Sequence, residues 1–384
     1  MTELGVYVHV PFCRHRCDYC AFATYTDRDA LMERYAAACR MELQRAFGTG
    51  DLPAATSVFF GGGTPSRMPA QWLAGILSAV PRASGAEVTV ECNPEDASID
   101  RLVTYREAGV TRMSFGVQST VPHVLVSLGR RHDPESVGRA LEAAASAGFD
   151  RVNVDLIYGA VAETDEDWAR SVADVLSLRH PPGHLSAYAL SVEPGTPLAR
   201  DASRHPDDDV QAARYELADT ILASAGYRWE EVSNWALPGQ SCRHNQLYWS
   251  QGSYIGIGSA AHSHRGDALA GNRWWNVRTP ERYVEAVEAG RSPVAGEEHV
   301  AGERRVLERL MLSLRTPAGV PQWALPDDDC LEGLVERSGE RAVLTVRGRL
   351  LANAVSTMLR AGPAAGRPGA AVSGAAAGRY PAVP

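Results

Sequence analysis

Short apolar runs alternate with longer helical stretches over residues 1–227. The spacing predicts strands near Val6–Val10, Ser57–Phe60, Glu87–Cys92, Arg112–Val117, Val152–Tyr158 and Leu185–Leu190. It predicts helices near Arg28–Phe47, Ala70–Val80, Ile99–Ala108, Pro134–Ala147, Glu166–Ser177 and Asp207–Ala225. Six strand–helix repeats predict an α/β fold whose parallel sheet forms a partial (βα)6 barrel. Any site is then expected at the carboxyl ends of the strands.

The pattern changes after this repeat. Residues 228–300 form an extension that is rich in Trp, Tyr, Gly and Ser in its first part. Residues 301–360 predict a small α-rich domain that resembles a winged helix, with helices at Glu303–Leu314, Asp329–Arg337 and Arg349–Leu359 and a strand at Val343–Val346. Its acidic balance favours a docking or lid role over DNA binding. The Ala/Gly/Pro-rich residues 361–384 predict a disordered tail.

Composition narrows the class of protein. The chain has 384 residues, 45% of them hydrophobic and 22% charged, with a net charge of −8. An acidic chain is a poor partner for nucleic acid, and no apolar run is long enough to span a membrane. The first residues lack the features of a secretory signal. Seven cysteines, three of them crowded together, fit metal binding in a reducing cytoplasm better than disulfides.

The crowded cysteines follow the first predicted strand in the run YVHVPFCRHRCDYCAF. Cys13, Cys17 and Cys20 have the spacing C-x3-C-x2-C, so three thiolates lie on one loop. Three thiolates can hold three irons of a 4Fe–4S cluster and leave the fourth iron open to an outside ligand. A zinc site completed by His15 or His9 is the alternative, but no second pair of cysteines supports it.

Two further features fall at predicted strand ends. The second strand runs into Gly61-Gly62-Gly63-Thr64-Pro65-Ser66, where glycines let the backbone approach a ligand closely, although an empty tight turn is the alternative. Glu91, Gln118 and Asp155 stand at the ends of three other strands. Polar groups there must face a polar ligand or be paired within the structure.

The cysteine spacing and the GGGTPS run together resemble the radical S-adenosylmethionine superfamily, most of all its coproporphyrinogen III oxidase-like branch, over residues 4–360. The resemblance implies that the three cysteines hold the cluster and that S-adenosylmethionine chelates its open iron. It implies cofactor contacts at Tyr7, Gly62, Gly63, Thr64, Glu91, Gln118, Arg130, Asp155 and Ala189. No residue is assigned as catalytic, and an electron donor is an expected partner if the cofactor is cleaved.

The run Arg243–Trp249 contains a second motif. From spacing alone, a half-buried strand with packed aromatics and a satisfied histidine is favoured. The run nevertheless matches the HNxxYW signature of the heme chaperones in this branch. The resemblance implies heme contacts at His244, Asn245, Tyr248 and Trp249, with His244 as the ligand candidate. His262 and His264 are secondary candidates.

The branch contains an enzyme and a binding protein. The oxidase decarboxylates coproporphyrinogen III, whereas the chaperone holds heme and passes it to an acceptor protein. The oxidase has a fourth cysteine two residues after the third and a longer segment before its cluster loop. This chain has Phe22 at that position, and its loop begins at Cys13. Both differences favour the heme chaperone, with the oxidase as the alternative.

Overall fold

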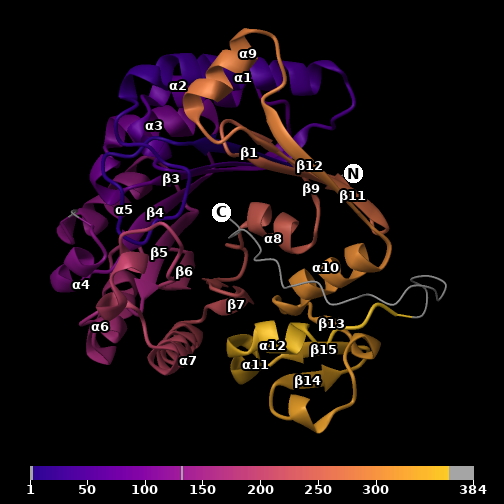
Figure 1. Ribbon diagram of the computed structural model, residues 1–384. Helices are drawn as coiled ribbons and strands as arrows, with labels where there is room; N and C mark the ends of the chain where they lie inside the picture. Colours follow the sequence, from indigo (N-terminus) through magenta and orange to yellow (C-terminus); the bar gives the residue numbers. More distant parts are fainter. Residues whose placement is uncertain (1–2, 131–132, 363–384) are drawn as a thin grey trace.

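A large mixed sheet organises the chain in the computed structural model, which describes residues 3–130 and 133–362 (Figure 1). The sheet has twelve strands in the order β12-β11-β10-β9-β1-β2-β3-β4-β5-β6-β8-β7. Their bounds are β1 Leu4–Val10, β2 Ala55–Gly62, β3 Arg82–Cys92, β4 Arg112–Gln118, β5 Val152–Tyr158, β6 His184–Ala189, β7 Arg228–Glu231, β8 Asn234–Ala236, β9 Ser253–Ile257, β10 His262–Gly266, β11 Ala270–Asn276 and β12 Val294–Ala301.

The parallel part of the sheet is β1 to β6, and helices cover its convex face (Figure 1). These helices are α1 Met32–Gly48, α2 Ala70–Ser78, α3 Ile99–Ala108, α4 Pro122–Ser127, α5 Glu135–Ser146, α6 Asp165–Leu176 and α7 Asp208–Ser224. The main hydrophobic core lies between them and the sheet, with Tyr35, Phe60 and Trp168 among its fully buried side chains. The predicted α/β partial barrel is confirmed, and α4 is an addition to the predicted helices.

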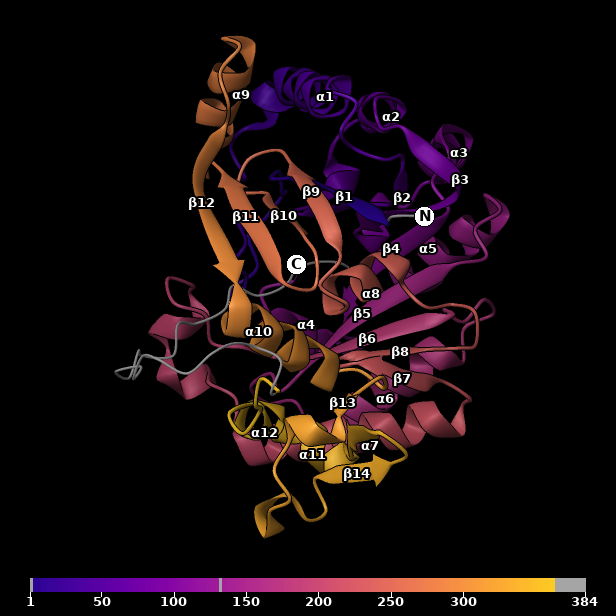
Figure 2. The same cartoon turned by 90° about the vertical axis from the view of Figure 1, so that its right-hand side faces the viewer.

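The chain then returns to the other edge of the parallel sheet. β9 pairs in parallel with β1, and β10, β11 and β12 continue from it as antiparallel strands. Figure 2 shows that these strands curve so that they lie opposite β4, β5 and β6. Two helices, α8 (Arg243–Trp249) and α10 (Gly302–Leu314), lie on the concave side, and α9 (Pro280–Glu288) lies beside α1. The expectation of a strand at Arg243–Trp249 is wrong, because these residues form α8.

The last described residues contain less helix than expected. The prediction of a helix over Asp329–Arg337 is wrong, because a 3-10 turn, Asp329–Leu331, is followed there by strand β14, Val335–Ser338. Gly333 and Gly339 adopt left-handed φ angles of 71° and 55°, which interrupt a helix and allow the tight turn from β14 to β15. The small sheet has the order β13-β15-β14. The remaining elements are β13 Val320–Pro321, β15 Arg341–Leu344, α11 Val346–Leu350 and α12 Ala352–Ser356.

A separate small core supports this C-terminal unit, with Leu314, Ala342 and Val355 among its buried residues. Arg349 joins the unit to the barrel, because its guanidinium lies 3.8 Å from the ring centroid of Trp229 and 3.0 Å from the Asp219 carboxylate. The expected disordered tail, 361–384, lies outside the described residues except for its first two. None of the helices in the described ranges is long and apolar enough to cross a membrane.

Candidate functional site

The cysteine loop leaves the carboxyl end of β1 and is fixed at both of its ends. The Cys13 N–H donates to the Tyr25 carbonyl over 3.0 Å, and the Tyr25 N–H donates to the Pro11 carbonyl over 2.8 Å. Cys13 is buried, whereas Cys17 and Cys20 are partly exposed. The loop therefore holds one thiol against the barrel and presents two toward its opening.

The glycines after β2 are required by the close approach of this loop. The Gly63 N–H donates to the Val10 carbonyl and the Thr64 N–H to the Phe12 carbonyl, each over 2.9 Å. A Cβ at Gly63 would lie 2.8 Å from the Val10 oxygen and 3.1 Å from the Cys13 Sγ. Gly62 has a φ of 108°, and a Cβ there would lie 2.3 Å from Nδ1 of His9. The run thus packs β2 against the cysteine loop, a role that the sequence pattern did not reveal.

Hydrogen-bond donors surround the thiols. The Thr64 hydroxyl donates to Cys13 Sγ over 3.5 Å, and Arg130 Nη1 donates to Cys17 Sγ over 3.6 Å. Arg130 is held in place because its Nη2 donates to the Gly116 carbonyl over 2.7 Å. Burial raises the pKa of the Cys13 thiol to about 11, and the neighbouring Cys20 adds to the rise. Thr64 and Arg130 therefore place donors against two of the three thiols.

Glu91 and Asp155 form a carboxylate pair inside the barrel. The Gly62 N–H donates to Glu91 over 3.3 Å, and the Ser114 hydroxyl donates to Asp155 over 3.2 Å. Burial raises the pKa of Glu91 to about 8, and the charge of Asp155 contributes to this rise. Burial also raises the pKa of Asp155. Both side chains can accept hydrogen bonds from a polar ligand.

The other expected cofactor positions lie along the same side of the barrel. Gln118 ends β4 with a left-handed φ of 66°, and Ala189 ends β6. Tyr7 stands on β1, with its hydroxyl 3.2 Å from Nδ1 of His9. Asp155, by contrast, lies in the middle of β5. The fold therefore gathers Tyr7, the glycine run, Glu91 and Arg130 around the cysteine loop.

A buried polar chain continues from Asp155 to the other side of the barrel, and sequence reasoning missed it. Asn153 Nδ2 donates to Asp155 over 2.8 Å, and Asn153 Oδ1 lies 2.6 Å from Nδ1 of His184. His184 Nε2 is 2.8 Å from Glu230, whose other oxygen accepts from Gln246 on α8 over 2.7 Å. The alternation of polar residues on β5 and β6 is the only signal of this chain in the sequence.

His244 on α8 is fully buried, and both of its ring nitrogens are occupied. Nδ1 lies 2.9 Å from the Ser57 hydroxyl, and Nε2 lies 2.8 Å from the Tyr248 hydroxyl. The ring also stacks on Phe59, with centroids 5.4 Å apart. Burial lowers the pKa of His244 to about 3, so the imidazole is neutral. Asn245 and Trp249, on the same helix, are partly exposed.

The secondary histidines differ from each other. His264 is buried, with Nδ1 2.8 Å from the Gly252 carbonyl and Nε2 2.8 Å from Nη1 of Arg305. His262 is exposed and lies beside Trp275, with ring centroids 5.9 Å apart and an interplanar angle of 27°. In the described ranges, no three His, Cys, Asp or Glu side chains gather around the position of a single metal ion. His9, one of the two zinc candidates, is engaged at both nitrogens by Tyr7 and the Ala23 carbonyl.

Comparisons with known proteins give the family. The radical SAM superfamily model matches residues 7–175. The chain is 43% identical to the heme chaperone HemW of Mycobacterium tuberculosis, over 91% of this chain and 93% of that protein. It is 31% identical to the heme chaperone HemW of Bacillus subtilis, over 91% and 97%. The chain belongs to the HemW family.

The solved structure of coproporphyrinogen III oxidase (HemN) from Escherichia coli, a radical SAM enzyme, has the same fold. It superposes with a TM-score of 0.78 at 23% identity and covers 93% of this chain and 90% of that one. Together with the radical SAM match and the HemW relatives, this fold confirms the resemblance to the oxidase-like branch of the radical SAM superfamily. Membership of this superfamily implies a 4Fe–4S cluster and S-adenosylmethionine in the HemW fold.

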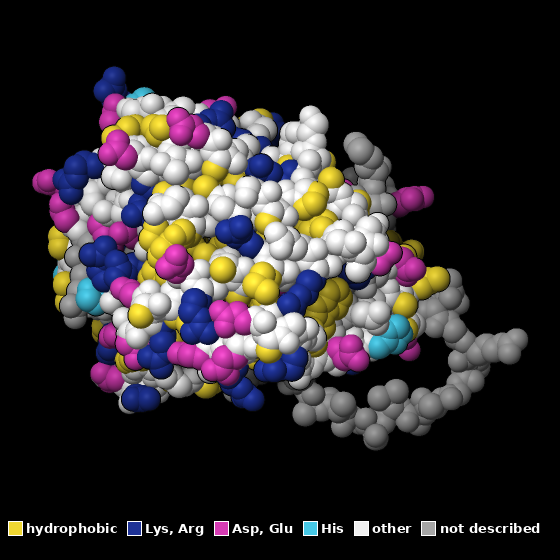
Figure 3. Space-filling model, turned by 90° about the horizontal axis from the view of Figure 1, so that it is seen from above, with side chains coloured by type: hydrophobic (Ala, Val, Ile, Leu, Met, Phe, Trp, Pro, Cys, Tyr) yellow, Lys and Arg dark blue, Asp and Glu magenta, His cyan; other side chains and the backbone are white. Residues whose placement is uncertain are grey.

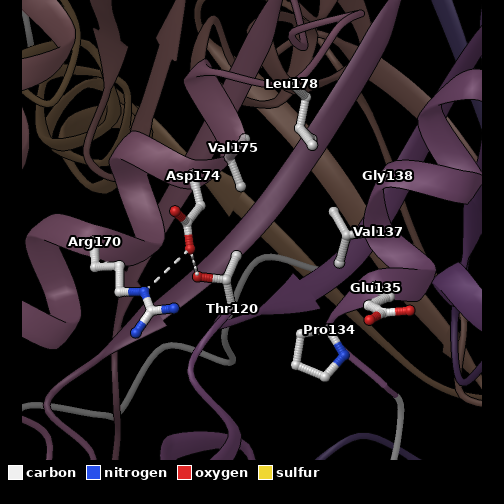
Figure 4. A pocket seen from close by; sticks show the side chains of 9 residues that line it. All are labelled: Thr120, Pro134, Glu135, Val137, Gly138, Arg170, Asp174, Val175 and Leu178. Atoms are coloured by element: carbon white, nitrogen blue, oxygen red, sulfur yellow. Dashed lines mark hydrogen bonds and ion pairs between the residues drawn. The ribbon is translucent and has the colours of Figure 1, made fainter.

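A shallow pocket lies outside the barrel, between α5 and α6 (Figure 4). Its polar wall is already paired, because the Thr120 hydroxyl donates to Asp174 over 2.7 Å and Arg170 lies 3.6 Å from the same carboxylate. On the face seen from above, acidic and basic side chains are interspersed (Figure 3). The candidate site is therefore the group of residues around the cysteine loop and the concave face of the sheet.

Proposed function

We propose that this chain is a heme chaperone, which binds heme and transfers it to an acceptor protein in the cytoplasm. The observation that carries the proposal is the similarity to the heme chaperones HemW, which reaches 43% identity over 91% of this chain. Phe22, which stands where the oxidase has a further cysteine, supports the same function. Its side chain is 42% exposed beside the cysteine loop.

The residues around the loop fit a resident cluster and its cofactor. We assign Cys13, Cys17 and Cys20 as cluster ligands, since a donor set of three thiols on one loop suits iron. For S-adenosylmethionine we assign Tyr7, Gly62, Gly63, Thr64, Glu91, Gln118, Arg130, Asp155 and Ala189. The bound cluster supplies an open iron and, with an electron donor, a reducing electron. Around it, Arg130 and Thr64 orient the thiols, and Glu91 and Asp155 supply acceptors for the cofactor's polar groups.

The concave face beside α8 is the proposed place for heme. Asn245, Tyr248 and Trp249 supply polar and aromatic contacts on this helix, and Tyr188 on β6 is 41% exposed inside the barrel. Tyr188 lies on the same face of the sheet as Asp155, because Ser186, two residues before it, is the cross-strand partner of Asp155. His244 can ligate iron only by giving up one of its buried bonds, to Ser57 or to Tyr248. In the folded chain we assign it to positioning α8.

A paired assay on one anaerobically reconstituted sample tests the function. Heme is titrated while the Soret band is followed, and coproporphyrinogen III is supplied with S-adenosylmethionine and a reductant. We expect a saturable Soret shift, release of the heme to an apo heme protein, and no protoporphyrinogen. Formation of protoporphyrinogen with consumption of the cofactor establishes the oxidase instead, and absence of heme binding rejects the chaperone.

A further inference from the structure

The concave face of the sheet carries one exposed histidine beyond the cluster region. Tyr254 on β9 pairs with Gly5 on β1, so period-two alternation places it on the same face as Tyr7. His264 on β10 pairs with Tyr254, and His262 lies two residues away on the same face. Figure 2 shows β10 among the strands that curve over the concave side. His262 therefore faces the same interior as the candidate cofactor site.

The ring nitrogens of His262 distinguish it from the other interior histidines. His9, His184, His244 and His264 each have both nitrogens within hydrogen-bond distance of a protein partner. Within residues 3–130 and 133–362, neither nitrogen of His262 has such a partner. A neutral imidazole with a free nitrogen lone pair is the form that binds heme iron.

Trp275 gives this imidazole a flat apolar neighbour. It is the cross-strand partner of His262 on β11. On β12, a Cβ at Gly296 would lie only 2.5 Å from the indole Cζ2, so the absence of a side chain there lets the indole pack against the strand. The centroids of the indole and the imidazole lie 5.9 Å apart at an interplanar angle of 27°, so the indole stacks on the His262 ring and holds the plane of that ring.

An unpaired cation, Arg278, lies near His262 and Trp275. Arg278 is exposed, and in the part of the chain that the structure describes its guanidinium has no hydrogen-bond or ion-pair partner. Its backbone carbonyl accepts from the Tyr25 hydroxyl over 3.4 Å, which places Arg278 at the end of the cysteine loop. Arg278 and His262 both lie near enough to His9 to lower its pKa, after the larger effect of burial. The cation and the free imidazole thus lie around one buried histidine.

We propose that His262 is the axial protein ligand of heme iron, with Trp275 stacked on its imidazole and Arg278 pairing with a propionate. The imidazole suits the iron, the indole holds the imidazole in one orientation, and the guanidinium suits the propionate carboxylates. This proposal rests on the proposed function, because it names the ligand within the heme site. It replaces His244 as ligand, since ligation there breaks a buried hydrogen bond, to Ser57 or to Tyr248, whereas ligation by His262 breaks none.

Heme titration of reconstituted variants tests the assignment. We expect His262→Ala to bind heme at least about tenfold more weakly and to lose the absorption and EPR features of histidine ligation. In His262→Gly, added imidazole should restore these features, which a merely structural role would not allow. His299→Ala is the matched control, because His299 is an exposed histidine on β12, two strands from β10 in the same sheet, and lies 2.7 Å from Asn272. It should bind heme like the unmodified chain.

The outcomes distinguish a failure of the ligand assignment from a failure of the proposed function. If His262→Ala keeps the affinity and the ligand features of the unmodified chain, His262 is not the ligand. If His244→Ala instead loses those features while its iron–sulfur spectrum and folding transition are unchanged, His244 is the ligand and the proposal is overturned. If the unmodified chain fails to bind heme, the proposed function itself fails. The iron–sulfur spectrum of each variant shows whether the barrel is intact.

Discussion

Replacing Gly63 by alanine should dislodge the cysteine loop without removing any cluster ligand. The added Cβ would lie 2.8 Å from the Val10 oxygen, 3.0 Å from the Phe12 oxygen and 3.1 Å from Cys13 Sγ. Two of these three atoms belong to the backbone, so no side-chain rotation relieves the contact. The strand end and the loop must move apart.

The cost of this movement follows from two opposing effects. Overpacking a close contact costs about 1–3 kcal/mol, whereas replacing glycine stabilises by about 0.4–1 kcal/mol through the unfolded chain. Separation of the segments also weakens the bonds from the Gly63 and Thr64 N–H groups to Val10 and Phe12, each 2.9 Å long. We expect a net loss of about 1–3 kcal/mol in the free energy of unfolding. Because the displaced segment carries Cys13, cluster loading should fall as well.

Urea unfolding of the apo chain measures the stability, and iron and sulfide content after reconstitution measures the loading. Gly48→Ala is the matched control: Gly48 ends α1, and a Cβ there meets nothing within 4 Å. That variant should unfold like the parent or slightly later, with full loading. If Gly63→Ala and Gly48→Ala have the same unfolding midpoint and the same iron content, the steric reasoning is wrong.

Three more predictions concern buried polar groups and the C-terminal unit. The pKa of Glu91 is raised from 4.5 to about 8, so the folded chain retains a proton that the unfolded chain loses, and stability falls as pH rises between these values. Glu91→Gln should remove a slope of up to about 1.4 kcal/mol per pH unit in urea titrations across that range. Asn153→Ala removes one donor to Asp155 while the Ser114 hydroxyl remains, and it should cost about 1–3 kcal/mol in unfolding free energy while weakening S-adenosylmethionine binding in calorimetry. Arg349→Ala loses the contact with Trp229 and should make the C-terminal unit more sensitive to limited proteolysis.

Each of these expectations has a clear contrary result. An unchanged pH slope in Glu91→Gln means that this carboxyl does not hold the proton. Asn153→Ala with the stability and cofactor affinity of the parent means that the polar chain through β5 is dispensable. Equal rates of cleavage in Arg349→Ala and the parent mean that other contacts fix the C-terminal unit.

Residue patterns along the chain predicted the class of fold and located the cysteine loop. Strand and helix periodicities are local, so the six repeats were found with boundary shifts of a few residues, and the C-x3-C-x2-C spacing is a property of one short segment. The helix expected at Asp329–Arg337 failed because left-handed glycines overrode the pattern. The helical state of Arg243–Trp249 was also missed, since a short aromatic run fits either element.

Which polar groups are free and which are already paired became visible only in the folded chain. His244, His262 and His264 were all open candidates in the sequence, yet their partners come from distant segments: Ser57 for His244, Arg305 for His264, and none for His262 among the described residues. The function of the glycine run in holding the cysteine loop was equally invisible, because it depends on two strand ends meeting in space. Hydrogen-bond satisfaction and close packing are properties of the folded chain, since they join residues whose separation in sequence carries no signal.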